Sequence, residues 1–132
     1  MSDYIAPHGL SAFAASMFDI KDKVVIITGA GRGLGRAMTF GFAAQGAKVF
    51  LAGRNEDVLA QTASELEDLG AEVGLLASDV SQEDDVLALR DAALDRFGHI
   101  DVLVNNAGIN PYYLPADQTD LQQWQELIDV NL

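Results

Sequence analysis

The 132-residue sequence contains no cysteine, so every kind of thiol chemistry is excluded. Disulfides, a cysteine nucleophile and thiolate metal sites are all ruled out. No group of His, Asp and Glu has the spacing of metal ligands either, and we expect no metal site. The absence of cysteine does not fix the redox compartment. The cytoplasm is the default expectation.

Basic residues are scarce. Lys and Arg total 8 against 20 Asp and Glu, giving a net charge of −12. Nucleic acids and anionic membranes both require a basic surface, so we expect neither as a partner. Residues 4–18 carry no charged side chain, but Pro7, His8 and Gly9 interrupt them. This segment has no basic leader and is too short to span a bilayer, so we expect neither a signal peptide nor an anchor. His8 is expected to be a surface residue.

The composition is that of a single globular domain preceded by an arm. Hydrophobic residues make up 49% of the chain, and its length suits one core. We expect an N-terminal arm over residues 1–19 and a domain over 20–132. Fraying, packing on the base of the domain and packing on a partner subunit all remain open for the arm. Its apolar residues fall at helical spacing: Leu10, Phe13, Ala14, Met17 and Phe18.

A strand, a glycine turn and a helix follow one another in residues 24–46. Val24 to Ile27 are four β-branched apolar residues, as in a strand buried on both faces. Gly29, Gly33 and Gly35 come next, before a helical pattern that we expect to end at Gly46. Such a junction lets the backbone approach a pyrophosphate, whose charge faces the free N–H groups of the helix. The alternative is a tight turn that only needs glycine.

Strands and helices alternate through the rest of the chain. Further strands are expected at 48–52, 72–77 and 100–105, with helices between and after them. This order predicts an α/β fold with a doubly wound, Rossmann-type parallel sheet. The expected caps are Asn55, Ser81, and a capping box of Thr119 with Gln122. The expected buried helix residues are Leu34, Ala37, Met38 and Phe42, then Val58, Leu59, Thr62, Leu66 and Leu69, then Val86, Leu89, Ala93 and Phe97, and last Leu121, Trp124, Leu127 and Ile128.

The chain stops after the fourth strand and the start of the next helix. A complete doubly wound fold has two halves, in strand order 3-2-1-4-5-6. The fourth strand would then lie at a bare edge. We therefore expect the N-terminal part of a longer protein, or one piece of a split one.

Two arginines are expected at one spot beyond the carboxyl ends of the strands. Arg32 lies in the glycine turn, and Arg54 follows the second strand. An acidic residue near the end of that strand would bind a ribose 2′-hydroxyl, whereas arginine accommodates a 2′-phosphate. Gly53 stands where the acid is expected, which favours a 2′-phosphate. The alternative is a pair of solvated surface arginines.

Two motifs resemble signatures of the short-chain dehydrogenase/reductase family. Thr28-Gly29-x-x-x-Gly33-x-Gly35 is similar to the Thr-Gly-x-x-x-Gly-x-Gly sequence of that family. A Gly-x-Gly-x-x-Gly fingerprint would instead need glycine at position 34, which is Leu34. Residues 105–108 read NNAG, the tetrapeptide that the family carries after its fourth strand; alone they would be only a turn. The resemblance covers nearly the whole chain after residue 18.

The resemblance implies a nicotinamide cofactor, and the two arginines favour NADP over NAD. In the family the position of Asp79 binds the adenine amino group, and the residue after it, here Val80, gives a backbone contact. Asp79 could equally help to cap the helix that begins near Ser81. The full set of residues expected to bind the cofactor is Thr28, Gly29, Gly31, Arg32, Gly33, Leu34, Gly35, Arg54, Asn55, Asp79, Val80, Asn105, Asn106, Ala107 and Gly108.

Asn131 is the one residue here that the resemblance assigns to catalysis. It lies at helical spacing from Trp124 and Ile128, so we expect it on their buried face; a polar residue at a frayed terminus is the alternative. The family's other catalytic residues are a Ser and a Tyr-x-x-x-Lys pair, and the last Lys of this chain is Lys48. We therefore expect the isolated chain to bind cofactor at most.

The sequence thus predicts an NADP(H)-dependent oxidoreductase that interconverts a carbonyl and an alcohol of a small molecule. The alternative is a non-catalytic nucleotide-binding module or regulatory partner. The resemblance also suggests a homo-oligomer, commonly a tetramer; a C-terminal segment could instead complete the sheet. Tyr112 and Tyr113 could line a substrate pocket or lie in a subunit contact. His99 precedes a strand and is given no role.

Overall fold

The computed structural model describes residues 16–132. Most of the expected arm, with His8, Leu10, Phe13 and Ala14, lies outside them. The described residues form four strands and four α-helices in alternation, with one short 3₁₀ helix, η1. The strands are β1 (Val24–Thr28), β2 (Lys48–Gly53), β3 (Val73–Ala77) and β4 (Val102–Val104). The helices are α2 (Gly33–Ala44), α3 (Glu56–Asp68), α4 (Glu83–Phe97), η1 (Ala116–Gln118) and α5 (Leu121–Asn131).

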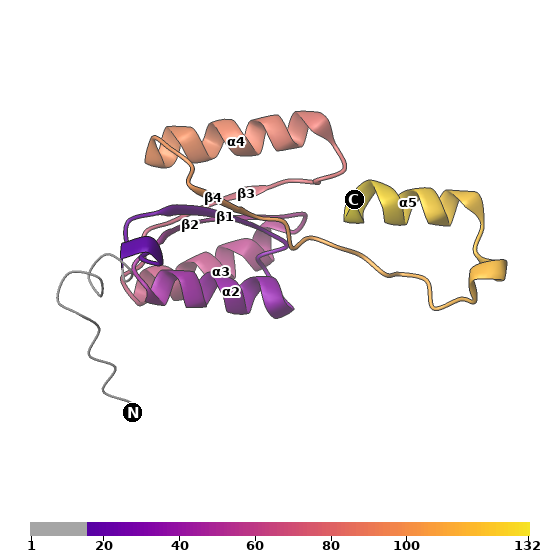
Figure 1. Ribbon diagram of the computed structural model, residues 1–132, viewed down its shortest axis with the longest axis horizontal. Helices are drawn as coiled ribbons and strands as arrows, with labels where there is room; N and C mark the ends of the chain where they lie inside the picture. The colour runs from indigo at the N-terminus through magenta and orange to yellow at the C-terminus, as the bar shows by residue number, and fades with distance from the viewer. Residues whose placement is uncertain (1–15) are drawn as a thin grey trace, which may run out of the picture.

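All four strands are parallel and lie in the order β3-β2-β1-β4. Helices α2 and α3 cover one face of the sheet, and α4 covers the other (Figure 1). The predicted doubly wound parallel sheet is therefore confirmed. Because the strands are parallel, their carboxyl ends meet at one edge of the sheet, and the loops that follow them lie together there.

Strand β1 is the centre of the core. Its five residues are buried, at most 4% exposed. Side chains alternate between the two faces: Val25 and Ile27 belong to the cluster beneath α2 and α3, and Ile26 to the cluster beneath α4. A continuous apolar strand with helices on both faces is typical of parallel sheets, which explains why the sequence signal for β1 was strong.

Strand β4 is shorter and more exposed than its apolar sequence predicts. It covers three residues instead of the expected 100–105, and Leu103 is 54% exposed. Only β1 pairs with it, so its outer edge has no neighbour among residues 16–132. The expected position at a bare edge is what the structure shows.

The buried faces of α2, α3 and α4 differ from the predicted ones. In α2, Leu34 is 78% exposed, and the helix buries Gly35 and Thr39. Small residues let α2 approach the sheet closely, which a search for large apolar side chains misses. Leu69 and Val86, also expected to be buried, are exposed. Leu69 directly follows the last residue of α3, and Val86 is the fourth residue of α4.

Of the predicted caps, one matches and two are wrong by one residue. The Asn55 carboxamide accepts the Val58 N–H at 3.1 Å and caps α3 as predicted. Helix α4 starts from Gln82 without a side-chain cap, and the Ser81 hydroxyl donates a hydrogen bond to Asp79. The capping box of α5 is Asp120 with Gln123, not Thr119 with Gln122.

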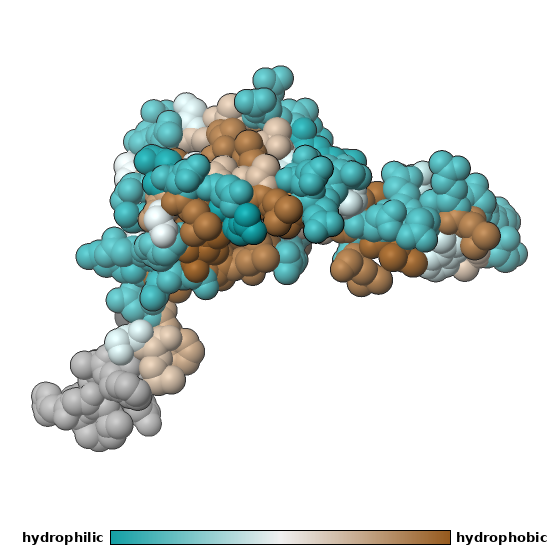
Figure 2. Space-filling model, turned by 90° about the horizontal axis from the view of Figure 1, so that it is seen from above, coloured by the Kyte–Doolittle hydropathy of each residue, from teal (hydrophilic) through white to brown (hydrophobic). Residues whose placement is uncertain are grey.

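Helix α5 stands away from the sheet at the end of a long loop (Figure 1). It has no buried residue: Leu121 is 86% exposed, and Trp124 and Ile128 are each nearly half exposed. Brown, apolar side chains are visible along this projecting lobe (Figure 2). The buried face that was predicted for α5 has nothing to pack against among the described residues. Within residues 16–132, no helix is both long and apolar enough to cross a bilayer.

Replacing Gly35 by alanine is predicted to destabilise the fold, whereas the same change at Gly41 of the same helix is not. A Cβ at Gly35 would lie 2.1 Å from the Gly29 carbonyl oxygen, while one at Gly41 meets nothing within 4 Å. Gly35→Ala should lower the free energy of unfolding by roughly 1–3 kcal/mol through overpacking. Gly41→Ala should raise it by roughly 0.5–1 kcal/mol, because alanine is the better helix former.

Urea unfolding of both variants checks this pair. Equal shifts of the two midpoints would show that the close approach at Gly35 is absent in solution.

Candidate functional site

A cavity of about 410 Å³ lies at the carboxyl ends of β1, β2 and β3. Nine of the predicted site residues line it: Gly29, Gly31, Arg32, Arg54, Asn55, Asp79, Val80, Ala107 and Gly108. Six others were not predicted: Gly53, Val58, Leu59, Ser78, Ile109 and Val130. Thr28, Gly33, Leu34, Gly35, Asn105, Asn106 and Asn131 are not part of the lining. The cavity therefore gathers segments far apart in the sequence.

The glycines of the turn have different functions. Gly29 has a φ of +66°, and Gly35 lies against its carbonyl oxygen, so both serve the packing of the turn. A Cβ at Gly31 would lie 2.7 Å from Val58 Cγ1. The lack of a side chain at Gly31 therefore allows α3 to lie close to the turn. Gly33 has a φ of +52°, and it is the one glycine of this turn at which an added Cβ would meet no atom within 4 Å. Gly29 and Gly35 therefore permit the close packing of the turn, while the surroundings of Gly33 have room for a ligand.

The N-terminus of α2 is left open by the protein itself. Its N-cap residue, Arg32, has extended backbone angles and makes no capping hydrogen bond with its side chain. The first turn contains no acidic residue. The first N–H groups of a helix have no partner within the helix and carry partial positive charge. This end of α2 can therefore accept an anion.

A hydrogen-bond network joins the end of β1 to the end of β4. The Thr28 hydroxyl oxygen accepts the N–H groups of Asn106 and Ala107, at 3.0 and 2.9 Å. The Asn106 side chain donates back to the Thr28 carbonyl at 2.9 Å. The Asn106 side chain thus satisfies a backbone carbonyl of the neighbouring strand. Asn105 is exposed and makes no such contact.

Arg54 and Arg32 both border the cavity and are both exposed. Among residues 16–132, neither forms an ion pair. Their charges are therefore available on the cavity wall. Arg54 is close enough to Asp79 to lower the pKa of that carboxyl, although this is a minor cause of the shift.

Asp79 closes the turn after β3. Its Oδ1 accepts the Ser81 hydroxyl at 2.7 Å and the Ser81 N–H at 3.0 Å. These two hydrogen bonds are the main reason why the pKa of Asp79 lies below its usual value, so the group is charged at neutral pH. Its own N–H donates to the Asp85 carboxylate at 2.8 Å. Asp79 therefore orders the segment before α4, and its second carboxylate oxygen takes no described hydrogen bond.

Asn131 is exposed and does not share a buried face with Trp124 and Ile128, contrary to the prediction. Its carboxamide pairs with the backbone of Ile109: Oδ1 accepts the Ile109 N–H at 2.7 Å, and Nδ2 donates to the Ile109 carbonyl at 2.9 Å. Gly108 lies beside it, where a Cβ would be 3.1 Å from Asn131 Oδ1. Asn131 thus fastens the end of α5 to the loop after β4. Nothing in the sequence marks Ile109, because its contact uses only backbone atoms.

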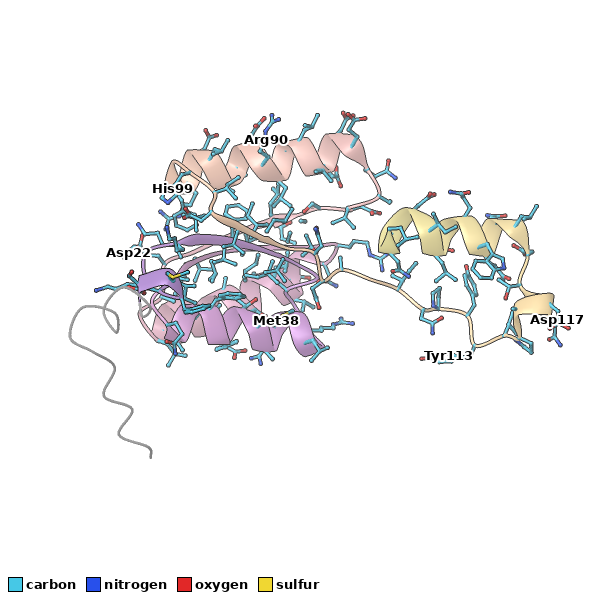
Figure 3. The ribbon with its side chains drawn as sticks, in the orientation of Figure 1. Asp22, Met38, Arg90, His99, Tyr113 and Asp117 are labelled. Atoms are coloured by element: carbon cyan, nitrogen blue, oxygen red, sulfur yellow. The ribbon has the colours of Figure 1, made fainter. Side chains whose placement is uncertain are left out.

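Neither tyrosine of the loop reaches the cavity. Tyr112 donates a hydrogen bond to the Glu126 carboxylate, which raises the pKa of its phenol. Tyr113 is 90% exposed and projects from the loop (Figure 3). His99 lies at the opposite end of the sheet and contacts Asp101, with 3.0 Å between Nε2 and Oδ2 (Figure 3). His99 is therefore not part of the cavity lining.

The chain matches known proteins along most of its length. The family model for short chain dehydrogenase matches residues 23–132. A 3β-hydroxysteroid dehydrogenase from Eggerthella lenta is 41% identical over 86% of this chain and 44% of its own length. An 11-beta-hydroxysteroid dehydrogenase from Sesamum indicum is 38% identical over 86% of this chain and 33% of its own. The chain therefore spans less than half the length of these curated relatives.

Solved structures give the same result. A short-chain dehydrogenase/reductase from Burkholderia phymatum in complex with NAD superposes with a TM-score of 0.83 and 40% identity, over 88% of this chain and 41% of the other. A metagenomic short-chain oxidoreductase in complex with NADP has a TM-score of 0.80 and 34% identity, over 86% of this chain and 52% of the other. With both motifs in place at the ends of β1 and β4, the chain belongs to the short-chain dehydrogenase/reductase family.

Proposed function

We propose that this chain is the cofactor-binding part of an NADP(H)-dependent oxidoreductase that interconverts a carbonyl and an alcohol of a small molecule. The observation that carries the proposal is the open N-terminus of α2, which begins at a glycine turn on the edge of the cavity. Relatives in complex with NAD and with NADP support a nicotinamide cofactor. The bound cofactor supplies or accepts the hydride.

The cofactor's diphosphate fits the start of α2. The backbone N–H groups of Gly33, Leu34 and Gly35 have no partner within the helix, and the space around Gly33 is open. The glycine turn itself is held in place by contacts of Thr28, Gly35 and Asn106, which do not line the cavity. Cofactor binding should therefore depend on residues that never touch the cofactor.

Arg54 and Arg32 are assigned to the 2′-phosphate that distinguishes NADP from NAD. Both line the cavity, and neither is held by an ion pair within the described residues. Gly53 stands at the end of β2, where an acidic residue would repel a phosphate. Asn55 contributes only indirectly, since its side chain caps α3. Asp79 and Val80 are assigned to the adenine, and the second Asp79 carboxylate oxygen accepts its amino group.

Ala107 and Gly108 border the same cavity from the β4 side, where they leave room for the cofactor's ribose. Asn131 is assigned to the catalytic group, and its fixed position beside Gly108 and Ile109 is consistent with that role. The remaining catalytic residues would lie in a segment that follows residue 132. The same segment would cover the free edge of β4 and the exposed face of α5, as the shares of the relatives' lengths suggest. We also propose that the protein forms a homo-oligomer and is located in the cytoplasm.

Arg54→Ala should reduce the affinity for NADP(H) by about 10- to 100-fold and leave that for NAD(H) nearly unchanged, because a charged hydrogen bond to phosphate contributes roughly 1.5–3 kcal/mol. Isothermal titration with both cofactors measures the ratio. The matched control is Arg90→Ala, which removes the same charge from α4, outside the cavity. An unchanged NADP/NAD ratio in Arg54→Ala would refute the assignment to the 2′-phosphate.

The isolated 132-residue chain should bind NADPH without catalysing hydride transfer. Binding follows from the open α2 N-terminus and the cavity, while the Ser and Tyr-x-x-x-Lys of the family are missing from this sequence. Titration of NADPH fluorescence measures binding, and absorbance at the nicotinamide band measures turnover with carbonyl substrates. Turnover would contradict the second half of the prediction. Failure to bind any nicotinamide nucleotide would contradict the first half.

A further inference from the structure

An apolar groove of about 490 Å³ lies between the C-terminal ends of α2 and α3, at the opposite end of the sheet from the cofactor cavity. Its walls include Phe40, Ala43 and Ala44 of α2 and Leu66 of α3, with Leu69 and Gly70 beyond the end of α3. Leu69 is 75% exposed. Covering the Leu69 side chain would remove apolar surface from water, which is energetically favourable.

The N-terminal arm enters the domain at this groove. The Asp22 N–H donates to the carbonyl of Gly46, a groove residue, at 2.9 Å. The side chain of Lys21 lies next to the same glycine, and Ile20 packs on the core cluster that contains Leu66. Figure 1 shows the indigo turn before β1 at the end of the molecule where α2 finishes.

The described end of the arm is apolar and exposed. Met17 is 65% exposed and Phe18 is 82% exposed. Residues 4–18 contain no charged side chain, although the whole chain carries a net charge of −12. Leu10, Phe13 and Ala14 continue the stripe of Met17 and Phe18 at helical spacing. An apolar segment thus precedes an apolar groove by only a few residues.

We propose that residues 10–15, which follow Pro7 and Gly9, fold back as a short amphipathic helix and dock into this groove, with Leu10, Phe13 and Ala14 against Leu69 and Ala44. A helix over residues 10–15 is roughly 9 Å long, which matches the roughly 8–10 Å between the axes of two packed helices. The short connection through residues 16–22 gives the arm an effective concentration in the millimolar range, which a second molecule does not reach at ordinary concentrations. The arm of the same chain is therefore the occupant.

The absence of native cysteine allows a direct test with the complete 132-residue chain. In Phe13→Cys/Leu69→Cys, mild oxidation should form an intramolecular disulfide at least about tenfold faster than in the control pair Phe13→Cys/Leu87→Cys, because docking raises the local concentration of one thiol near the other. Leu87 is a fair control: it is a leucine, 40% exposed, on α4 across the sheet. Non-reducing gels and intact mass follow the reaction over a range of protein concentrations.

A third variant separates docking from mere proximity. Adding Ala44→Glu to the first pair places a charge in the groove at an exposed helix position, and the rate should fall to that of the control. Equal rates for the two pairs, or no effect of Ala44→Glu, would overturn the proposal. Intermolecular disulfides whose yield rises with protein concentration would overturn it too, because a second copy would then cover the groove.

Discussion

The structure depends on how closely the start of α2 approaches the end of β1. Gly35 lies against the Gly29 carbonyl, and the Asn106 carboxamide fills the remaining space while it bonds to the Thr28 carbonyl. A side chain at either glycine would push the helix away from the strand. Because this close contact fixes the start of α2 against the end of β1, the first N–H groups of α2 lie at the carboxyl edge of the sheet, beside the cavity.

The electrostatics of the site oppose those of the whole molecule. The chain carries −12 overall, yet Arg32 and Arg54 lie on one cavity with the positive end of α2. Charges of this kind act over a range set by salt, about 10 Å at 0.1 M ionic strength. A phosphate close to the cavity therefore senses the local positive groups more than the distant acids. Asp79 is the exception, and its Ser81 hydrogen bonds keep it charged beside Arg54.

The central half of the fold could be read from the sequence, because β1 and β2 are buried on both faces and their apolar runs leave no alternative. The sequence also predicted the glycine turn, the NNAG segment and the Asn55 cap, since each uses residue types with specific backbone or capping preferences. The periphery was not. Leu34 and Leu69 fit an apolar period yet are exposed, because periodicity does not say how far the sheet extends beneath a helix.

Site residues that act through their side chains could be predicted from the sequence, whereas those that act through backbone atoms could not. Arg32, Arg54 and Asp79 were predicted and border one cavity. The contact between Asn131 and Ile109 was missed, because any residue at position 109 offers the same two atoms. The distinct functions of Gly31 and Gly33 also required coordinates, since only the position of Val58 separates them.

The free edge of β4 has a consequence for handling the chain. No strand among residues 16–132 pairs with its outer backbone groups, which together with the exposed Leu103 form a short template on which strands of other molecules can add. Mutual repulsion between like-charged molecules keeps such edges apart in dilute buffer. Added salt weakens that repulsion while it leaves strand pairing intact, so concentrated stocks in high salt should turn cloudy sooner than those in low salt.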